Sequence, residues 1–217
     1  MEIIRLMIMA VNFLWLIALC SAIETPQYTV IHRESNFEIR LMRESSWMSA
    51  PVKELSFEKA TRLGFHRLFE YIQGANLNFS RIAMTAPLLT SVVPDAGPLH
   101  SSAYHVQLYL PVAFQETPPT PLPELNLEHS VWPSRCLAVR TFSGFARDSN
   151  VVKEAEKLAV SLSRSPWANA TTPGSVFAYS IAQYSPPLRI FGRINEVWVD
   201  ISGSILDDCK SIRVSVY

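Results

Sequence analysis

Residues 56–74 read SFEKATRLGFHRLFEYIQG and carry the clearest fold signal in the chain. Ser56 can accept a hydrogen bond from a backbone N–H of the first helical turn, and Gly74 tolerates the left-handed conformation that commonly follows a helix. Between them, apolar residues recur at helical spacing: Phe57, Ala60, Gly64, Leu68 and Ile72. The stretch therefore predicts one amphipathic helix that packs its apolar face on another layer of the fold.

The segments around this helix predict strands. Residues 37–41 alternate between apolar and charged side chains, and strand-like runs follow the helix at 81–93 and 104–110. The second half of the chain has a strand-like run at 137–142 and then the capping candidates Asp148, Ser149 and Asn150. A second helical pattern and strand-like runs at 176–184 and 190–201 follow them.

Strand, helix, strand and strand thus follow one another twice, over about residues 37–111 and 135–201. This order predicts an α+β fold of two pseudo-duplicated units. We expect a twisted, mainly antiparallel sheet or distorted barrel that is flanked by two helices. The proline-rich stretch 117–123 predicts an exposed loop between the units.

The N-terminal residues have a different character. An apolar run over 6–19 follows Arg5, and Cys20-Ser21-Ala22 places small residues where signal peptidase reads them. We predict a signal peptide over 1–22, a single domain over 23–217 and a location in the secretory pathway, extracellular or in an endomembrane lumen. An uncleaved anchor is the alternative, but the run is short against the roughly 20 apolar residues of a membrane span. After cleavage we expect no stable membrane insertion.

Composition excludes some classes of partner. The chain has 19 basic and 19 acidic residues and no contiguous Lys/Arg block, which argues against nucleic acid and against a polybasic membrane patch. The two cysteines beyond the leader could pair in an oxidising compartment, but Cys136 lies in an apolar run, which favours an inert core thiol over a bond to Cys209. Two sequons predict glycosylation of Asn78 and Asn169.

Catalytic and metal-binding patterns are missing from the sequence. The five histidines show no metal-ligand spacing, and there is neither a G-x-S-x-G motif nor a phosphate-cradling loop. We therefore predict no enzyme and no metal site. His66 is expected on the solvated flank of the first helix. Alternation places His105 on one face of its strand with Gln107 and Tyr109, and if the other face is core, His105 faces solvent.

The first helix also carries a possible binding surface, formed by Arg62, Phe65 and Phe69. One interpretation is a core stripe with one snorkelling arginine. The other is a flat aromatic-lined groove with a cation at its rim. Such a groove suits a planar amphiphile that bears carboxylates, such as a porphyrin.

Several motifs, in order, resemble the SOUL/heme-binding protein family: Gly64-Phe65, Tyr71-Ile72-Gln73-Gly74-Ala75-Asn76, Met84-Thr85-Ala86-Pro87, Tyr184-Ser185-Pro186 and Asn195-Glu196-Val197-Trp198. The resemblance implies two α/β repeats and an open hydrophobic groove against the first helix that binds heme or another tetrapyrrole. By position, Arg62, Phe65 and Phe69 correspond to groove residues of the family.

Three positions depart from the family pattern. Leu41 stands where some members carry a histidine proposed as the axial ligand, Met42 replaces the aromatic residue that usually follows, and Glu70 replaces a groove lysine. We therefore assign no axial ligand and expect reversible tetrapyrrole binding by a carrier or buffer. The alternative is a ligand-sensing or protein-interaction module that keeps the fold and no longer binds heme.

Overall fold

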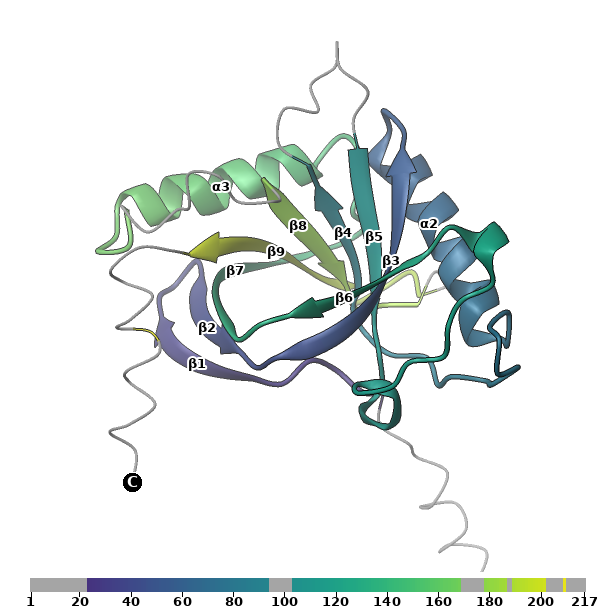
Figure 1. The fold of residues 1–217 in the computed structure, drawn as a ribbon. Coiled ribbons are helices and arrows are strands. Elements are labelled where there is room, and N and C mark those ends of the chain that lie inside the picture. Colours follow the sequence, from purple (N-terminus) through teal and green to yellow (C-terminus); the bar gives the residue numbers. More distant parts are fainter. Residues whose placement is uncertain (1–22, 94–102, 169–177, 187–188, 202–208, 210–217) are drawn as a thin grey trace, which may run out of the picture.

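The computed structural model describes residues 23–93, 103–168, 178–186, 189–201 and Cys209. One nine-stranded antiparallel sheet carries two α-helices (Figure 1). The helices are α2 (Phe57–Ile72) and α3 (Val151–Ser163). The strands are β1 (Tyr28–Arg33), β2 (Glu38–Met42), β3 (Ser45–Lys53), β4 (Leu88–Val92), β5 (Ala103–Tyr109), β6 (Glu128–Trp132), β7 (Arg135–Ser143), β8 (Tyr179–Gln183) and β9 (Ile194–Ile201).

The strand order reveals the duplication. The sheet runs β1-β2-β7-β9-β8-β4-β5-β3-β6, and from β2 to β6 it reads the same from either end once β2–β5 are matched with β6–β9. Each unit is therefore strand, strand, helix, strand, strand, and the two units meet where β4 pairs with β8. This confirms the predicted α+β fold of pseudo-duplicated units with two helices. Each unit has one strand more than predicted, because β3 and β6 lack a clear alternation of apolar and polar residues.

The predicted limits of the first helix are confirmed. The Ser56 hydroxyl accepts the N–H of Lys59 at 3.1 Å, and Gly74 follows the helix with a φ of 115°. Gly64 lets α2 approach the sheet closely, because a Cβ atom at this position would lie 2.4 Å from the side chain of Val106. Only glycine fits there without a shift of the helix or of β5.

Asp148 caps a helix other than the one that follows it in sequence. Its carboxylate accepts the N–H of Phe57 at 2.5 Å and the hydroxyl of Ser56 at 2.7 Å. The loop between β7 and α3 is thus fastened to the start of α2, 91 residues earlier in the chain. Such a partner is suited to the positive end of the helix dipole.

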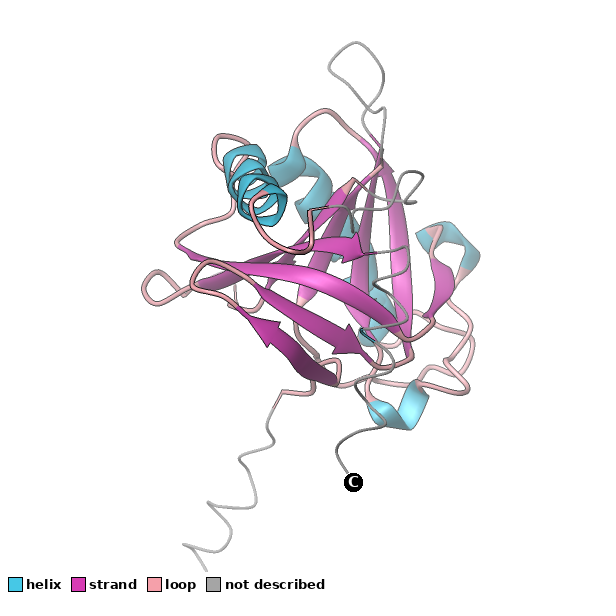
Figure 2. Cartoon of the chain, turned by 90° about the vertical axis from the view of Figure 1, so that its left-hand side faces the viewer, coloured by secondary structure: helices cyan, strands magenta, loops and turns pink. Residues whose placement is uncertain are grey.

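Both faces of the sheet are apolar. One packs against the helices, and the other, on which Trp47 lies 5.0 Å from Trp132 and 5.6 Å from Tyr109 between ring centroids, is enclosed as the sheet curls on itself (Figure 2). The prediction that one face of β5 meets solvent is therefore wrong. Gln107 and Tyr109 are buried, and His105 is half-buried with its Nδ1 3.2 Å from the Ser49 hydroxyl.

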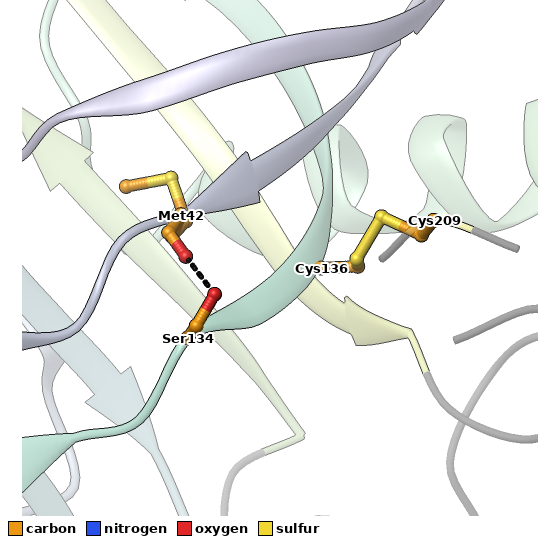
Figure 3. Close-up of a disulfide and its surroundings, with 4 residues drawn as sticks. All are labelled: Met42, Ser134, Cys136 and Cys209. Atoms are coloured by element: carbon orange, nitrogen blue, oxygen red, sulfur yellow. Dashed lines mark hydrogen bonds between the residues drawn. A yellow bond between two sulfur atoms is a disulfide. The ribbon is translucent and has the colours of Figure 1, made fainter. Parts of the chain in front are cut away.

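Cys136 is bonded to Cys209, so the interpretation of Cys136 as an inert core thiol is wrong (Figure 3). The bond joins the start of β7 to a residue 73 positions later. Among the described residues, neither helix is long and apolar enough to cross a bilayer.

Candidate ligand-binding cavity

A cavity of about 460 Å³ opens beside the N-terminal half of α2. Its walls come from α2, the segment that leads into β4, the loop between β7 and α3, the end of β8 with the residues that follow it, Arg193 and Ile23. The hydrogen bonds of Asp148 hold two of these walls together, namely the loop between β7 and α3 and the start of α2. The cavity thus lies at the junction of the two duplicated units.

Most of the wall is apolar. Phe57, Phe65, Met84, Leu88, Phe145 and Pro186 contribute side chains to it. The Met84-Thr85-Ala86-Pro87 motif forms one side, where the Thr85 hydroxyl donates to the carbonyl of Tyr109 at 2.5 Å and the Ala86–Pro87 peptide bond is cis. The buried Thr85 therefore fixes the backbone of this wall, while Met84 and Ala86 meet the cavity.

Two arginines, one glutamine and one glutamate give the cavity most of its chemistry. Glu58 is an exposed carboxylate that accepts the N–H of Asp148 at 3.2 Å. Arg62 is exposed at the rim and makes no hydrogen bond or ion pair with another described residue. Gln183 has a buried Oε1 that lacks a partner among the described residues. Arg193 is buried, lies over the Phe145 ring at 4.4 Å, and donates to the carbonyls of Pro186 and Arg189 at 2.8 Å. Arg193 thus builds the wall, whereas Arg62 is available to an anionic group.

The three residues predicted for the first helix separate into two groups. Arg62 and Phe65 line the cavity. Phe69 does not; it is 45% exposed, one turn farther along α2, with its ring centroid 5.8 Å from that of Phe65. Neither aromatic residue belongs to the buried face of the helix, so the core interpretation of this stripe does not describe their positions.

The positions that depart from the family pattern lie away from the cavity wall. Leu41 packs in the cluster that faces the helices, and Met42 packs with the tryptophans on the opposite face of the sheet. Glu70 pairs with the exposed His66 at 3.0 Å, which agrees with the prediction that His66 is solvated. No histidine is among the described residues that line the cavity.

A buried charge network behind the cavity was not found by sequence reasoning. Tyr184, a residue of the cavity wall, donates its hydroxyl to Glu196 at 2.8 Å, and Trp198 Nε1 donates to the same oxygen at 2.8 Å. The other oxygen of Glu196 pairs with Arg40 at 3.0 Å. Arg40 also pairs with Glu38 at 2.8 Å. The sequence offered one signal for this network, which is the position of Arg40 between apolar residues of a strand.

The ionisation of this network follows from its burial. Burial and the neighbouring Glu196 carboxylate raise the pKa of Tyr184 far above its ordinary value, so the hydroxyl remains a donor. Burial alone would lower the pKa of Arg40, but Glu196 and Glu38 raise it above its ordinary value. The Asn195-Glu196-Val197-Trp198 motif therefore fixes the position of Tyr184 in the cavity wall.

The two glycosylation candidates differ in what the structure describes. Asn78 is exposed on the loop after α2, and the neighbouring Phe79 is 82% exposed, so this sequon is open to solvent. Asn169 lies outside the described residues.

Comparison with known proteins agrees with this fold. The family model of the SOUL heme-binding protein matches residues 23–200, and the chain belongs to this family. Human heme-binding protein 2 is 32% identical over 189 residues, which cover 84% of this chain and 88% of that protein. Heme-binding protein 1 of Xenopus laevis is 28% identical over 75% of this chain and 82% of its own length.

Solved structures of other proteins are similar to this chain in fold alone. The C-terminal domain of EcmrR matches with a TM-score of 0.52 at 10% identity, over 81% of this chain and 98% of that one. A hydrolase from Listeria innocua matches with a TM-score of 0.51 at 10% identity, over 79% and 94%.

Proposed function

We propose that this protein binds heme or a related tetrapyrrole reversibly in the cavity beside α2, as a carrier or buffer in the secretory pathway. The observation that most supports this proposal is the cavity itself, with its apolar wall, the aromatic Phe65 and, at the rim, Arg62, which has no partner among the described residues. Its volume of about 460 Å³ falls within the roughly 300–1,000 Å³ of small-molecule sites. Membership of a family named for heme binding supports the same ligand class.

The residues present fit the two chemical parts of a tetrapyrrole. The macrocycle is apolar, as are the wall residues Phe57, Phe65 and Leu88, and its propionates would meet Arg62. The lining offers no histidine, and the Tyr184 hydroxyl is already bonded to Glu196. Binding therefore rests on the ring and the propionates, with no axial ligand assigned.

The energetics favour reversible binding. A ligand that buries about 500 Å² of apolar surface gains roughly 12 kcal/mol at about 25 cal/mol per Å². Association costs at least about 4 kcal/mol, which leaves no more than about 8 kcal/mol and so a Kd no tighter than about micromolar. This suits a carrier that takes up and releases its ligand, and it requires no catalytic group.

Two features support the secretory route. The apolar run over 6–19 has the pattern of a signal peptide, and the Cys136–Cys209 disulfide is of a kind that persists in oxidising compartments. Protein made in a eukaryotic secretory host should begin near Ile23 and carry glycan at Asn78 or Asn169. Soluble cytosolic protein with an intact Met1 would contradict this route.

Titration of the purified protein with hemin and with metal-free protoporphyrin tests the ligand class. Both should bind with micromolar affinity, because the contacts are with the ring and the propionates. Replacement of any one histidine by alanine should change hemin affinity by less than about tenfold, or roughly 1.4 kcal/mol. If neither porphyrin binds, the alternative holds, in which the domain senses another ligand or a protein partner.

A further inference from the structure

We infer that the mouth of the cavity docks on the surface of a bilayer that contains anionic phospholipids, with the turn at residues 189–194 as its leading edge. This inference rests on the proposed function for the reason to dock, since a tetrapyrrole partitions into membranes. The assignment of the docking surface rests on three observations that do not depend on the proposed function.

The first observation is the exposure of large apolar side chains around the mouth. On the turn between β8 and β9, which reaches the cavity through Arg193, Ile190 is 66% exposed and Phe191 86%, and Ile194 at the start of β9 is 50% exposed. Phe145, which lines the cavity and lies next to Arg193 of this turn, is 37% exposed. Clustered exposure of this kind marks an interaction surface, whereas single exposed apolar residues are ordinary.

The second observation is how the turn is held. Arg193 donates to the carbonyls of Pro186 and Arg189, and Arg189 Nε donates to the carbonyl of Phe191 at 3.0 Å. Gly192 supplies a φ of 63° at the tip. The arginines thus satisfy backbone carbonyls that would otherwise need water, so the tip can enter an apolar medium at reduced cost.

The third observation is charge. The sequence has no Lys/Arg block, but the fold gathers the exposed Arg62, Arg147 and Arg189 around the mouth, while the buried Arg193 belongs to the cavity wall. Two carboxylates lie close by and keep their charge: Asp148, which faces the start of α2, and Glu58, which lines the cavity and accepts the N–H of Asp148 at 3.2 Å. The three exposed arginines outnumber these two carboxylates. Arginines beside an exposed aromatic tip match a bilayer interface with anionic headgroups.

A bilayer fits this surface better than a folded partner. The tip exposes its apolar side chains by half or more, with Phe191 86% exposed, so burying them needs a medium that closes around a protrusion. A lipid surface does this without a matching groove. It would also place the cavity mouth, which includes Ile23, Met84 and Phe145, against the phase that holds an amphiphilic ligand.

Vesicle co-sedimentation tests the inference on protein from a eukaryotic secretory host, with its N-terminus sequenced. Wild-type protein should bind phosphatidylcholine–phosphatidylserine vesicles more tightly than phosphatidylcholine vesicles. Phe191→Ser should lower that affinity by about tenfold or more, as expected for loss of a buried phenyl group. Phe79→Ser is the matched control, because Phe79 is 82% exposed beyond the opposite end of α2 and should leave the affinity unchanged.

A charge variant and a local probe complete the test. Arg147→Glu should weaken binding to anionic vesicles by about tenfold at low salt, and by less at high salt. An environment-sensitive fluorophore attached to the Phe191→Cys variant should report entry into the lipid, whereas one attached to Phe79→Cys should report water. This difference should hold whether or not the N-terminal leader is retained.

Several results would overturn the inference. Unaltered vesicle affinity of folded Phe191→Ser, a fluorophore at 191 that stays in water, or self-association that this variant abolishes would each assign the turn another role. Hemin titration without vesicles separates the two proposals. Protein that binds hemin but no vesicles refutes the docking surface alone, and protein that binds vesicles but no porphyrin refutes the proposed ligand alone.

Discussion

The two helices occupy equivalent places in the duplicated fold, yet they meet the sheet differently. Counted from the first residue of each helix, Gly64 of α2 and Leu158 of α3 are both eighth. Gly64 brings α2 against Val106, whereas the fully buried Leu158 fills the space between α3 and the sheet. A glycine in one copy and a leucine in the other thus set two different helix–sheet spacings.

The exposed faces of the helices differ as well. On α3, Glu154 pairs with Arg140 of β7 at 3.3 Å and with Lys157 at 2.5 Å, so its polar groups bind the protein's own surface. On α2, Arg62 is unpaired among the described residues and Phe65 faces the cavity. No residue of α3 lines that cavity. The two duplicated units thus have the same order of helices and strands, but only the helix α2 borders the proposed site.

The largest effect should come from the packing of α3. Leu158→Ala removes a fully buried side chain and leaves a void, which should lower the free energy of unfolding by about 3 kcal/mol. Ligand affinity per folded molecule should not change, because α3 does not border the cavity. Urea unfolding and hemin titration of the same variant measure the two quantities. A large loss of affinity would mean that the two halves are coupled.

Gly64→Ala tests the matching position in α2. Helix propensity alone would make alanine better by about 1 kcal/mol. The new Cβ would meet Val106 at 2.4 Å, so we expect a net loss of about 2 kcal/mol in the free energy of unfolding. Val106→Ala should not restore this loss in the double variant, because it removes the two methyl groups of Val106 but keeps its Cβ atom, which also lies 2.4 Å from the new one. A stabilised single variant would show that the close approach is not needed.

Sequence reasoning found the features that are local in the chain. Ser56 and Gly74 mark the ends of α2 because a cap acts within a few residues, and period-two alternation marked β2 and β5. The strand at Ser45–Lys53 escaped because three serines and a proline hide its pattern. Arg62 and Phe65 were placed together by helical spacing alone.

Features that join distant segments were beyond the sequence. Asp148 was one of three candidate caps, with Ser149 and Asn150, for the helix that follows it, but its side-chain partners belong to the start of α2. The network of Arg40, Tyr184 and Glu196 brings together β2, β9 and the residue after β8. The sequence shows a charge in β2 and in β9 without showing its partner. The sheet's curl, which buries the second face of β5, likewise depends on the whole strand order.

Phe65→Ala should show whether ligand binding depends on α2 in particular. Loss of one ring contact should weaken hemin and metal-free protoporphyrin alike by about tenfold, or roughly 1.4 kcal/mol. Phe69→Ala should have a smaller effect, because Phe69 does not line the cavity. Val160→Ala on α3, at a side chain that is 48% exposed, is the control and should have none. Equal effects of Phe65→Ala and Val160→Ala, measured by fluorescence quenching, would remove α2 from the site.

The smallest effect should be electrostatic and should depend on salt. Arg62→Glu replaces the unpaired cation at the cavity rim by an anion, so we expect porphyrin affinity to fall by about fivefold at low ionic strength. The loss should shrink as salt screens the interaction between the propionate and residue 62. Lys153→Glu makes the same charge change on the exposed surface of α3 and controls for net charge. If both variants weaken binding equally, the effect comes from the net charge of the protein and not from a contact of residue 62 with the ligand. An effect confined to Arg62→Glu, with an unchanged melting temperature, would place a carboxylate of the ligand at the rim and distinguish the two helices by function as well as by packing.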